Sequence, residues 1–218
     1  MISYAVDVLI IIILFLVFGY THSLFASNKF KKLFIPKLGN KIAFYRLGYN
    51  IVSLFTLYFF YEISPKPDIV IYDLPGPFGV IILIPQFLSL AGLLWSFKYF
   101  SAQEFLGIKQ IERYLNGNYH VDELDEKLTL KISGPYKFSR HPVYFFSILF
   151  LLFRPIMDLF YVTVFICSVA YFYIGSIYEE RKLVENFGEI YREYQNQVPR
   201  IFPTRIFQPY RNNISAGE

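Results

Sequence analysis

The residues best suited to chemistry lie in the C-terminal half of the chain. Gly134-Pro135-Tyr136 is followed by Ser139-Arg140-His141-Pro142-Val143-Tyr144, where an apolar run begins. A helix N-terminus with a cation beside it offers a site for a carboxylate or a phosphate. Arg140 and His141 are therefore candidates for anion binding. The alternative is that Arg140 follows the distribution of cations in membrane proteins and His141 lies at the membrane surface.

A second candidate is the pair Glu179-Glu180, which directly follows another apolar run. Two carboxylates at a membrane boundary are costly to desolvate unless a cation or a hydrogen-bond donor meets them. Taken alone, the pair also fits the solvated start of a helix. A cation elsewhere in the chain is needed to make it a site.

The elements that must position these residues are membrane helices. The chain has 218 residues, of which 55% are hydrophobic, and its mean hydropathy is +0.38. A spanning helix needs about 20 mainly apolar residues. The fold class predicted is an all-α integral membrane protein with about five transmembrane helices and a C-terminal amphipathic cytoplasmic helix. The five apolar segments cover residues 4–25, 42–63, 78–97, 143–153 and 159–178.

The connections differ in length and polarity. Residues 64–77 are expected to form a rigid outer loop, and residues 154–158 the turn of a tight helical hairpin whose first arm is too short to cross the membrane unaided. Residues 101–115 can continue as a helix after the third apolar segment. The polar stretch that follows carries an acidic run expected to be solvated: Asp122, Glu123, Asp125 and Glu126.

After the last apolar segment, residues 179–197 are expected to form the amphipathic helix. Its apolar residues recur every three or four positions, and Pro199 and Pro203 end it. They are Leu183, Phe187, Tyr191 and Tyr194. We expect residues 1–97 to form an N-terminal three-helix membrane region and residues 98–218 the functional core.

Orientation follows from the basic residues. Six of them and no acidic residue lie between Lys29 and Arg46, whereas the connection 64–77 contains only Lys66. The positive-inside rule then places the N-terminus outside and the C-terminus in the cytoplasm. The net charge of +4 is explained by topology and by anionic lipid, so the lipid bilayer is the expected partner and no nucleic acid is needed.

Together these residues form a pattern over the C-terminal part of the chain: Gly-Pro-Tyr, Arg-His-Pro-x-Tyr, an apolar hairpin, Glu-Glu, Phe187-Gly188 and Val198-Pro199-Arg200. The pattern resembles the isoprenylcysteine carboxyl methyltransferase superfamily of membrane enzymes, which includes phospholipid methyltransferases. The chain looks most like the branch of methanethiol S-methyltransferases and NnrU-type proteins. Two further motifs favour that branch: residues 22–26, His-Ser-Leu-x-Ala, and residues 105–110, Phe-Leu-Gly-Ile-Lys-Gln.

The resemblance implies an enzyme that uses S-adenosyl-L-methionine, bound in a cytoplasmic pocket between the hairpin and the tail. It also implies which residues contact the cofactor. They are Leu128, Thr129, Leu130, Lys131, Tyr136, Arg140, His141, Pro142, Val143 and Glu179. The cofactor carboxylate suits Arg140 or the helix start, and its ammonium and sulfonium suit Glu179.

The methyl acceptor is expected to be a small or lipophilic molecule. Where the resemblance predicts an arginine for a substrate carboxylate, one helical turn before Glu179, this chain has Gly175. A small thiol such as methanethiol is therefore favoured over prenylcysteine. A thiol must lose its proton, and His141 is the candidate catalytic base, with His22 a weaker one; a structural role for either histidine stays open.

Four alternatives remain. Within the same superfamily, the chain would be a prenylcysteine carboxyl methyltransferase or a phospholipid methyltransferase. A membrane reductase that uses NADPH has a similar C-terminal architecture. The fourth alternative is a non-catalytic NnrU-like membrane protein that keeps the fold for interaction or regulation.

Overall fold

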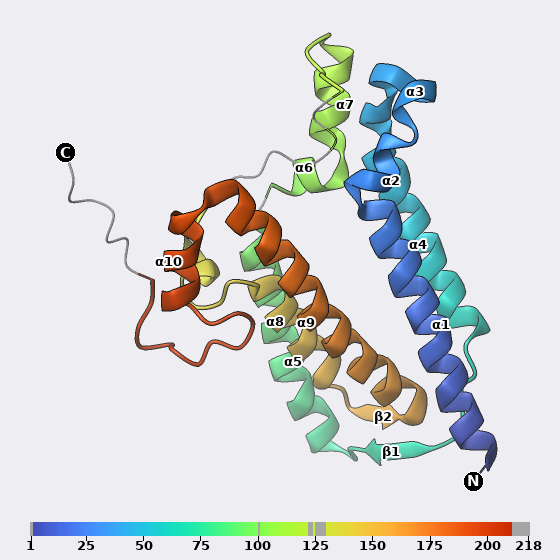
Figure 1. The fold of residues 1–218 in the computed structure, drawn as a ribbon. Coiled ribbons are helices and arrows are strands. Elements are labelled where there is room, and N and C mark those ends of the chain that lie inside the picture. Colours follow the sequence, from blue (N-terminus) through green and yellow to red (C-terminus); the bar gives the residue numbers. More distant parts are fainter. Residues whose placement is uncertain (1, 100, 122–123, 125–129, 211–218) are drawn as a thin grey trace. The chain divides into compact units, whose positions relative to one another are not determined.

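A computed structural model describes residues 2–99, 101–121, 124 and 130–210. These residues are mostly helical, as the sequence predicts, and Figure 1 shows the order of the elements. The chain divides into two compact units, which are considered separately. The first contains Met1–Pro67 and Ser101–Thr129, and the second contains Asp68–Phe100 and Leu130–Glu218. The predicted acidic run at Asp122, Glu123, Asp125 and Glu126 lies outside the described residues.

In the first unit, two long helices pack against each other through aromatic side chains. Phe15 of α1 meets Phe60 of α4 edge to face, with ring centroids 5.7 Å apart. Nearer the other end of α1, His22 Nδ1 lies 3.1 Å from the Ser53 hydroxyl. The helices of this unit are α1 (Ile2–Ala26), α2 (Asn28–Lys32), α3 (Ile35–Leu38), η1 (Gly39–Phe44), α4 (Tyr45–Ile63), α6 (Ala102–Leu106) and α7 (Ile108–Leu115).

The single helix predicted over residues 101–115 is wrong in one respect, because α6 and α7 are separate. Gly107 lies between them with φ +88°, a conformation that glycine adopts without steric cost. A side chain at Gly107 would also meet the backbone nitrogen of Leu47 at 2.8 Å.

The second unit holds the candidate site residues. Its elements are β1 (Val70–Asp73), α5 (Pro77–Phe97), η2 (Gly134–Lys137), α8 (Pro142–Leu152), β2 (Ile156–Asp158), α9 (Leu159–Phe187) and α10 (Glu189–Gln197). Helices α5 and α8 approach closely, because a β-carbon at Gly92 would lie 2.3 Å from the Phe146 ring. The Gln86 amide donates to the carbonyl of Phe150 at 3.2 Å, which joins the same two helices.

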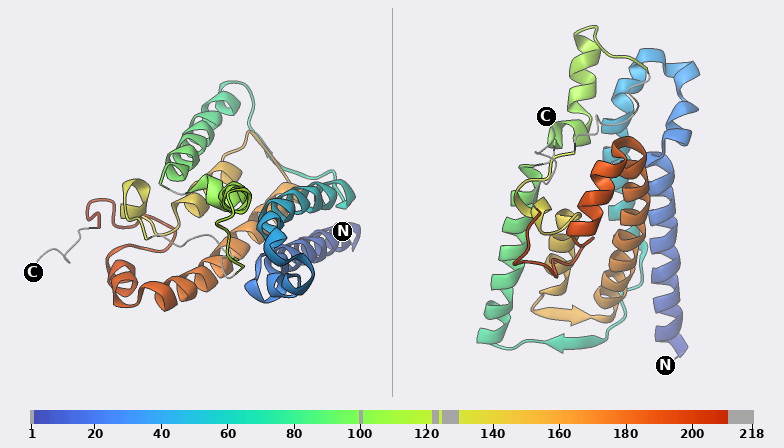
Figure 2. Two further views of the ribbon diagram at one scale, coloured as in Figure 1. Left: turned by 90° about the horizontal axis from the view of Figure 1, so that it is seen from above. Right: turned by 60° about the vertical axis from the view of Figure 1, so that its left-hand side comes forward.

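The loop predicted at residues 64–77 and the helical turn predicted at residues 154–158 are both corrected. Strands β1 and β2 pair there as a two-stranded antiparallel sheet. The reason is that a short turn beside an apolar hairpin leaves backbone groups without partners unless a neighbouring segment supplies them. Figure 2 shows this sheet at the opposite end of α9 from α10.

Three helices among the described residues are long and apolar enough to cross a membrane: Ser3–Ala26, Pro77–Phe97 and Leu159–Phe187. The prediction of a multi-pass membrane protein is confirmed at this level, while the count of five stays a prediction. Helix α4 has 19 residues but carries polar side chains such as Asn50, Ser53 and Glu62. Helix α8 has 11 residues, so at about 1.5 Å per residue it is roughly 16 Å long.

The amphipathic helix predicted over residues 179–197 is not one helix. The first half of that range continues α9, whose 29 residues extend roughly 43 Å at about 1.5 Å per residue. Gly188 then breaks the helix with φ +56°, and α10 turns back from it. Tyr191 and Tyr194 of α10 are buried with Val198 and Tyr210 in a small hydrophobic core.

Candidate functional site

The centre of the site is a buried ion pair between two residues that are 40 positions apart. Arg140, just before α8, donates from Nε to Glu180 Oε1 at 2.7 Å and from Nη2 to Oε2 at 3.1 Å. The Arg140 side chain is 8% exposed and that of Glu180 is 3% exposed. A bidentate arginine–carboxylate contact has good geometry for two buried charges, since both oxygens are engaged at once.

The remaining donors of Arg140 hold the end of α10. Its Nη1 donates to the carbonyls of Gln195 at 2.8 Å and Val198 at 2.5 Å. The backbone strengthens this contact, because the Arg140 amide donates to Pro199 O at 3.0 Å. Arg140 therefore joins the start of α8, the late turns of α9 and the end of α10.

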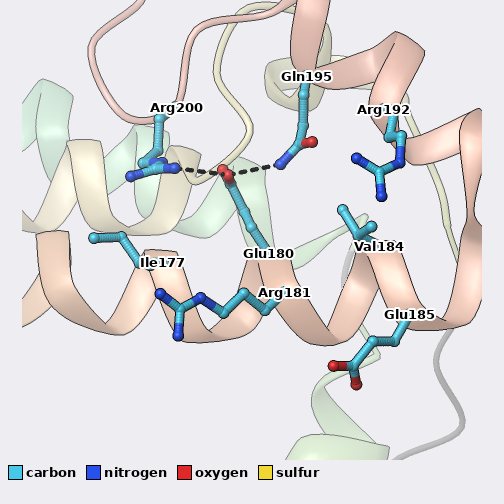
Figure 3. A pocket seen from close by; sticks show the side chains of 8 residues that line it. All are labelled: Ile177, Glu180, Arg181, Val184, Glu185, Arg192, Gln195 and Arg200. Atoms are coloured by element: carbon cyan, nitrogen blue, oxygen red, sulfur yellow. Dashed lines mark hydrogen bonds and ion pairs between the residues drawn. The ribbon is translucent and has the colours of Figure 1, made fainter.

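Glu180 accepts from three further side chains. The Gln195 amide donates at 2.9 Å, Arg200 Nη2 at 3.1 Å, and His141 Nε2 lies 3.2 Å away. Figure 3 shows the Glu180 carboxylate between Gln195 and Arg200. We call Arg140, His141, Glu180, Gln195 and Arg200 the Glu180 network. Two arginines and a histidine compensate the buried carboxylate, as its desolvation requires.

His141 connects the two adjacent glutamates. It is the residue that precedes α8, and its side chain is 7% exposed. Nδ1 lies 3.3 Å from Glu179 Oε2 and Nε2 lies 3.2 Å from Glu180 Oε1. Burial lowers the pKa of His141, but hydrogen bonds to Glu179 and Glu180 outweigh it, so the pKa is raised overall.

Glu179 differs from its neighbour because its side chain is 53% exposed. The Tyr144 hydroxyl donates to Glu179 Oε1. The Tyr144 ring stacks on His141, with centroids 5.3 Å apart, and on Phe172, with centroids 4.9 Å apart. Burial and the charge of Glu179 raise the pKa of Tyr136 to about 12, so Tyr136 keeps its hydroxyl proton near neutral pH. Glu179 is thus an accessible carboxylate among aromatic and hydroxyl groups.

A pocket of about 410 Å³ adjoins the Glu180 network. Its size lies within the range of about 300–1,000 Å³ that is typical of small-molecule sites. Residues of both charges line it, from α9, α10 and the segment after α10 (Figure 3). They are Ile177, Glu180, Arg181, Val184, Glu185, Arg192, Gln195 and Arg200. Arg200 Nε is buried without a hydrogen-bond partner among the described residues, so a polar ligand could complete it.

The structure brings together the predicted residues from the middle of the sequence pattern. Arg140, His141 and Glu179 lie in one cluster through the contacts above. The Tyr136 carbonyl accepts from the Tyr194 hydroxyl at 2.6 Å, which places it beside α10. Pro142 is buried in the first turn of α8 and Val143 beside it is half-buried.

The predicted residues 128–131 are placed less clearly. Leu128 and Thr129 lie outside the described residues. Leu130 packs against the core around Tyr191 and Tyr194. Lys131 is exposed, and its Nζ lies 5.8 Å from the centroid of the Tyr99 ring.

Sequence reasoning missed several members of the site. The sequence pattern contained Tyr144, Glu180 and Arg200, but gave no signal that Glu180 rather than Glu179 meets Arg140. Gln195 carried no signal, because its contact depends on α10 turning back at Gly188. A search for polar residues one turn apart on α10 would have found Arg192 and Gln195.

These features define a class of protein: a multi-pass helical membrane protein with a polar, ion-paired site beside an apolar hairpin. No protein-family model and no solved structure matches the chain. Curated proteins do match it along most of its length. Methanethiol S-methyltransferase 1 of Bradyrhizobium diazoefficiens is 28% identical over 209 residues, which cover 93% of this chain and 69% of the relative.

Other relatives agree. Methanethiol S-methyltransferase of Pseudomonas deceptionensis is 27% identical, with 93% of this chain and 75% of the relative covered. That of Mycobacterium tuberculosis is 25% identical, with 90% and 78% covered. The chain is a distant homologue of methanethiol S-methyltransferases, and the resemblance inferred from the sequence is confirmed.

The Glu180 network predicts a difference between the two glutamates. Glu180→Gln should destabilise the protein by about 3–5 kcal/mol, because Arg140 and Arg200 lose the buried charge that neutralises them. Thermal unfolding in detergent measures the effect. Glu179→Gln is the matched control, since its side chain is half exposed. Equal melting temperatures for the two variants would show that the ion pair does not stabilise the fold.

The raised pKa of His141 predicts a dependence of stability on pH. The folded state binds the His141 proton more tightly than the unfolded chain, so protonation stabilises the fold. This stabilisation is complete below about pH 6.5, the ordinary histidine pKa, and is lost as pH rises through the folded pKa. The melting-temperature advantage of the native protein over His141→Asn should therefore shrink as pH rises. A constant difference would contradict the assignment.

Proposed function

We propose that this protein is a membrane methyltransferase that uses S-adenosyl-L-methionine to methylate a small thiol, with methanethiol the first candidate. The observation that carries the proposal is the homology along about nine-tenths of the chain to proteins that are each named methanethiol S-methyltransferase. The homology reaches across both compact units, so it is not limited to the C-terminal sequence pattern.

The residues of the site fit this cofactor. S-adenosylmethionine carries a carboxylate together with an ammonium and a sulfonium, and it supplies an electrophilic methyl group when bound. Arg181, Arg192 and Arg200 line the pocket and can meet the carboxylate, and Arg200 Nε has a donor to offer. Glu179, with its exposed carboxylate, can meet the cationic end. Tyr136, Pro142 and Val143 remain proposed contacts, as do Leu128, Thr129, Leu130 and Lys131.

Arg140 has a more specific role in this proposal than the sequence implied. Its Nε, Nη1 and Nη2 all donate within the protein, to Glu180 and to two carbonyls. We therefore assign Arg140 to positioning Glu180 and α10, rather than to direct contact with the cofactor carboxylate. Its contribution to binding is the shape that it gives the pocket wall.

The acceptor side lies near Gly175. A β-carbon there would meet only the Tyr144 hydroxyl, at 3.9 Å, so space is present one turn before Glu179. That space contains no cation for a substrate carboxylate, which favours a neutral thiol. A closed site would hold the thiol against the methyl donor and exclude water, so that proximity supplies most of the rate.

Deprotonation of the thiol is assigned to His141. The thiolate is the nucleophile, and an imidazole near neutral pKa is a suitable proton acceptor. Only the neutral ring accepts a proton. The raised pKa of His141 therefore makes the site more favourable for this step at mildly alkaline pH.

We also propose the finer topology. Five membrane-embedded helices, with α8 crossing only partly, place the N-terminus outside and the C-terminus in the cytoplasm. The asymmetry of basic residues between the first and second connections supports this orientation. The pocket would then open to the compartment that makes the cofactor.

Binding of the cofactor tests Glu179. Glu179→Ala should weaken the affinity of the purified protein for S-adenosylmethionine about 10-fold or more, the loss expected for a hydrogen bond or ion pair to a charged group. Calorimetry in detergent measures it. Glu112→Ala is the matched control, because Glu112 is an exposed carboxylate paired with Lys109 in the other unit. Unchanged affinity in Glu179→Ala would remove Glu179 from the site.

A labelled-methyl assay tests the reaction. Membranes that contain the protein should transfer label from S-adenosylmethionine to methanethiol, and less to longer thiols, to prenylcysteine or to phosphatidylethanolamine. Oxidation of NADPH is followed in parallel and should not occur. Label in the lipid alone would overturn the choice of a thiol, NADPH oxidation without methyl transfer would favour a reductase, and binding of neither cofactor would favour a non-catalytic protein.

A further inference from the structure

An exposed apolar turn follows α10 and has no role in the site described above. Phe202 is 51% exposed, Ile206 is 58% exposed and Phe207 is 98% exposed. These residues are not part of a membrane helix, because the segment from Ile201 to Tyr210 consists of bends and turns. Large apolar side chains clustered on an exposed turn indicate a surface that meets something apolar.

Both ends of this segment are fixed beside the start of α8. The His141 amide donates to Arg200 O at 2.9 Å, and the Tyr210 amide donates to Lys137 O at 3.0 Å. Phe202 also meets Phe145 of α8 edge to face, with ring centroids 6.1 Å apart. Figures 1 and 2 show the chain after α10 turning back beside η2. The exposed turn is therefore continuous with the apolar surface of α8.

The charge of the segment fits an anionic bilayer surface. Residues 199–210 contain Arg200 and Arg205 and no acidic residue. Arg205 Nη1 donates to the carbonyls of Asn196 at 2.8 Å and Gln197 at 3.3 Å, so its cation is held at the C-terminus of α10. Aromatic residues with a cation beside them are typical of segments that lie at the membrane interface.

The length of α8 gives the turn something to do. At roughly 16 Å, α8 is much shorter than the hydrocarbon core of about 30 Å. Its depth in the bilayer is therefore not fixed by its own length. An anchor beside its first turn would fix that depth, and with it the depth of Arg140 and His141.

We propose that Phe202, Ile206 and Phe207 form an interfacial anchor that inserts at the boundary between lipid headgroups and acyl chains. The anchor holds the Glu180 network at the bilayer surface. The occupant of the apolar surface is lipid. This inference does not depend on which reaction the protein catalyses.

Depth-dependent quenching tests the anchor. A fluorescent label is attached to Gln208→Cys in a Cys167→Ala background, with the three apolar residues intact, and the protein is placed as single copies in nanodiscs that contain anionic lipid. A lipid with a nitroxide near its headgroup should quench this label at least about twofold more than a label at Glu189→Cys, whose native side chain is 90% exposed on α10. Replacing Phe202, Ile206 and Phe207 with serine should abolish the difference.

Three results would overturn the proposal. One is equal quenching of the labels at positions 208 and 189. Another is a difference that survives the triple serine variant. The third is shielding of position 208 only when several copies share a nanodisc, which would identify a second copy of the chain as the occupant. The first comparison leaves the apolar residues unchanged, so it holds even where the serine variant fails to fold.

Discussion

The ion pair between Arg140 and Glu180 is the interaction on which the C-terminal unit depends. Removing two charges from water costs several kcal/mol for each ion, and attraction offsets this only if the remaining hydrogen-bonding groups are also satisfied. Here Glu180 accepts from Arg140, Gln195 and Arg200 and contacts His141, while Arg140 also donates to two carbonyls of α10 and its following residues. The requirement to satisfy one buried carboxylate therefore determines where α8 starts, where α9 turns polar and where α10 ends.

Helix lengths in this unit follow from the same constraint. An apolar helix of about 20 residues spans the hydrocarbon core, and α9 continues for nine residues beyond that length before Gly188 ends it. The extension carries Glu179 and Glu180 to the membrane boundary, where arginines from the tail reach them. The short α8 begins at the level of this boundary because Arg140 and His141 are bound there. The Gly188 break then allows α10 to turn back and close the pocket.

Much of this arrangement could be predicted from the sequence, and the reasons for the failures are physical. Long apolar runs predicted α1, α5 and α9, because the need to satisfy backbone groups in lipid leaves few alternatives to a helix. The Arg-His-Pro and Glu-Glu motifs correctly indicated segments that meet. The pairing of β1 with β2 was missed because both strands are short and lack alternation. The role of Glu180 was missed because adjacent residues on a helix point about 100° apart, and nothing local shows which one turns inward.

The two adjacent glutamates thus divide the requirements of the site between them. Glu180 is buried and already accepts from several donors, so it has little capacity to meet a ligand. Glu179 is half exposed and is held by Tyr144 and His141, which leaves its charge accessible. Under the proposed function, the rigid member fixes the geometry and the accessible member meets a cationic group. The choice of acceptor then depends on Gly175, one turn earlier, where the chain provides space without a charge. A carboxylate acceptor would have to be desolvated there without a cation, whereas a small thiol carries no such cost.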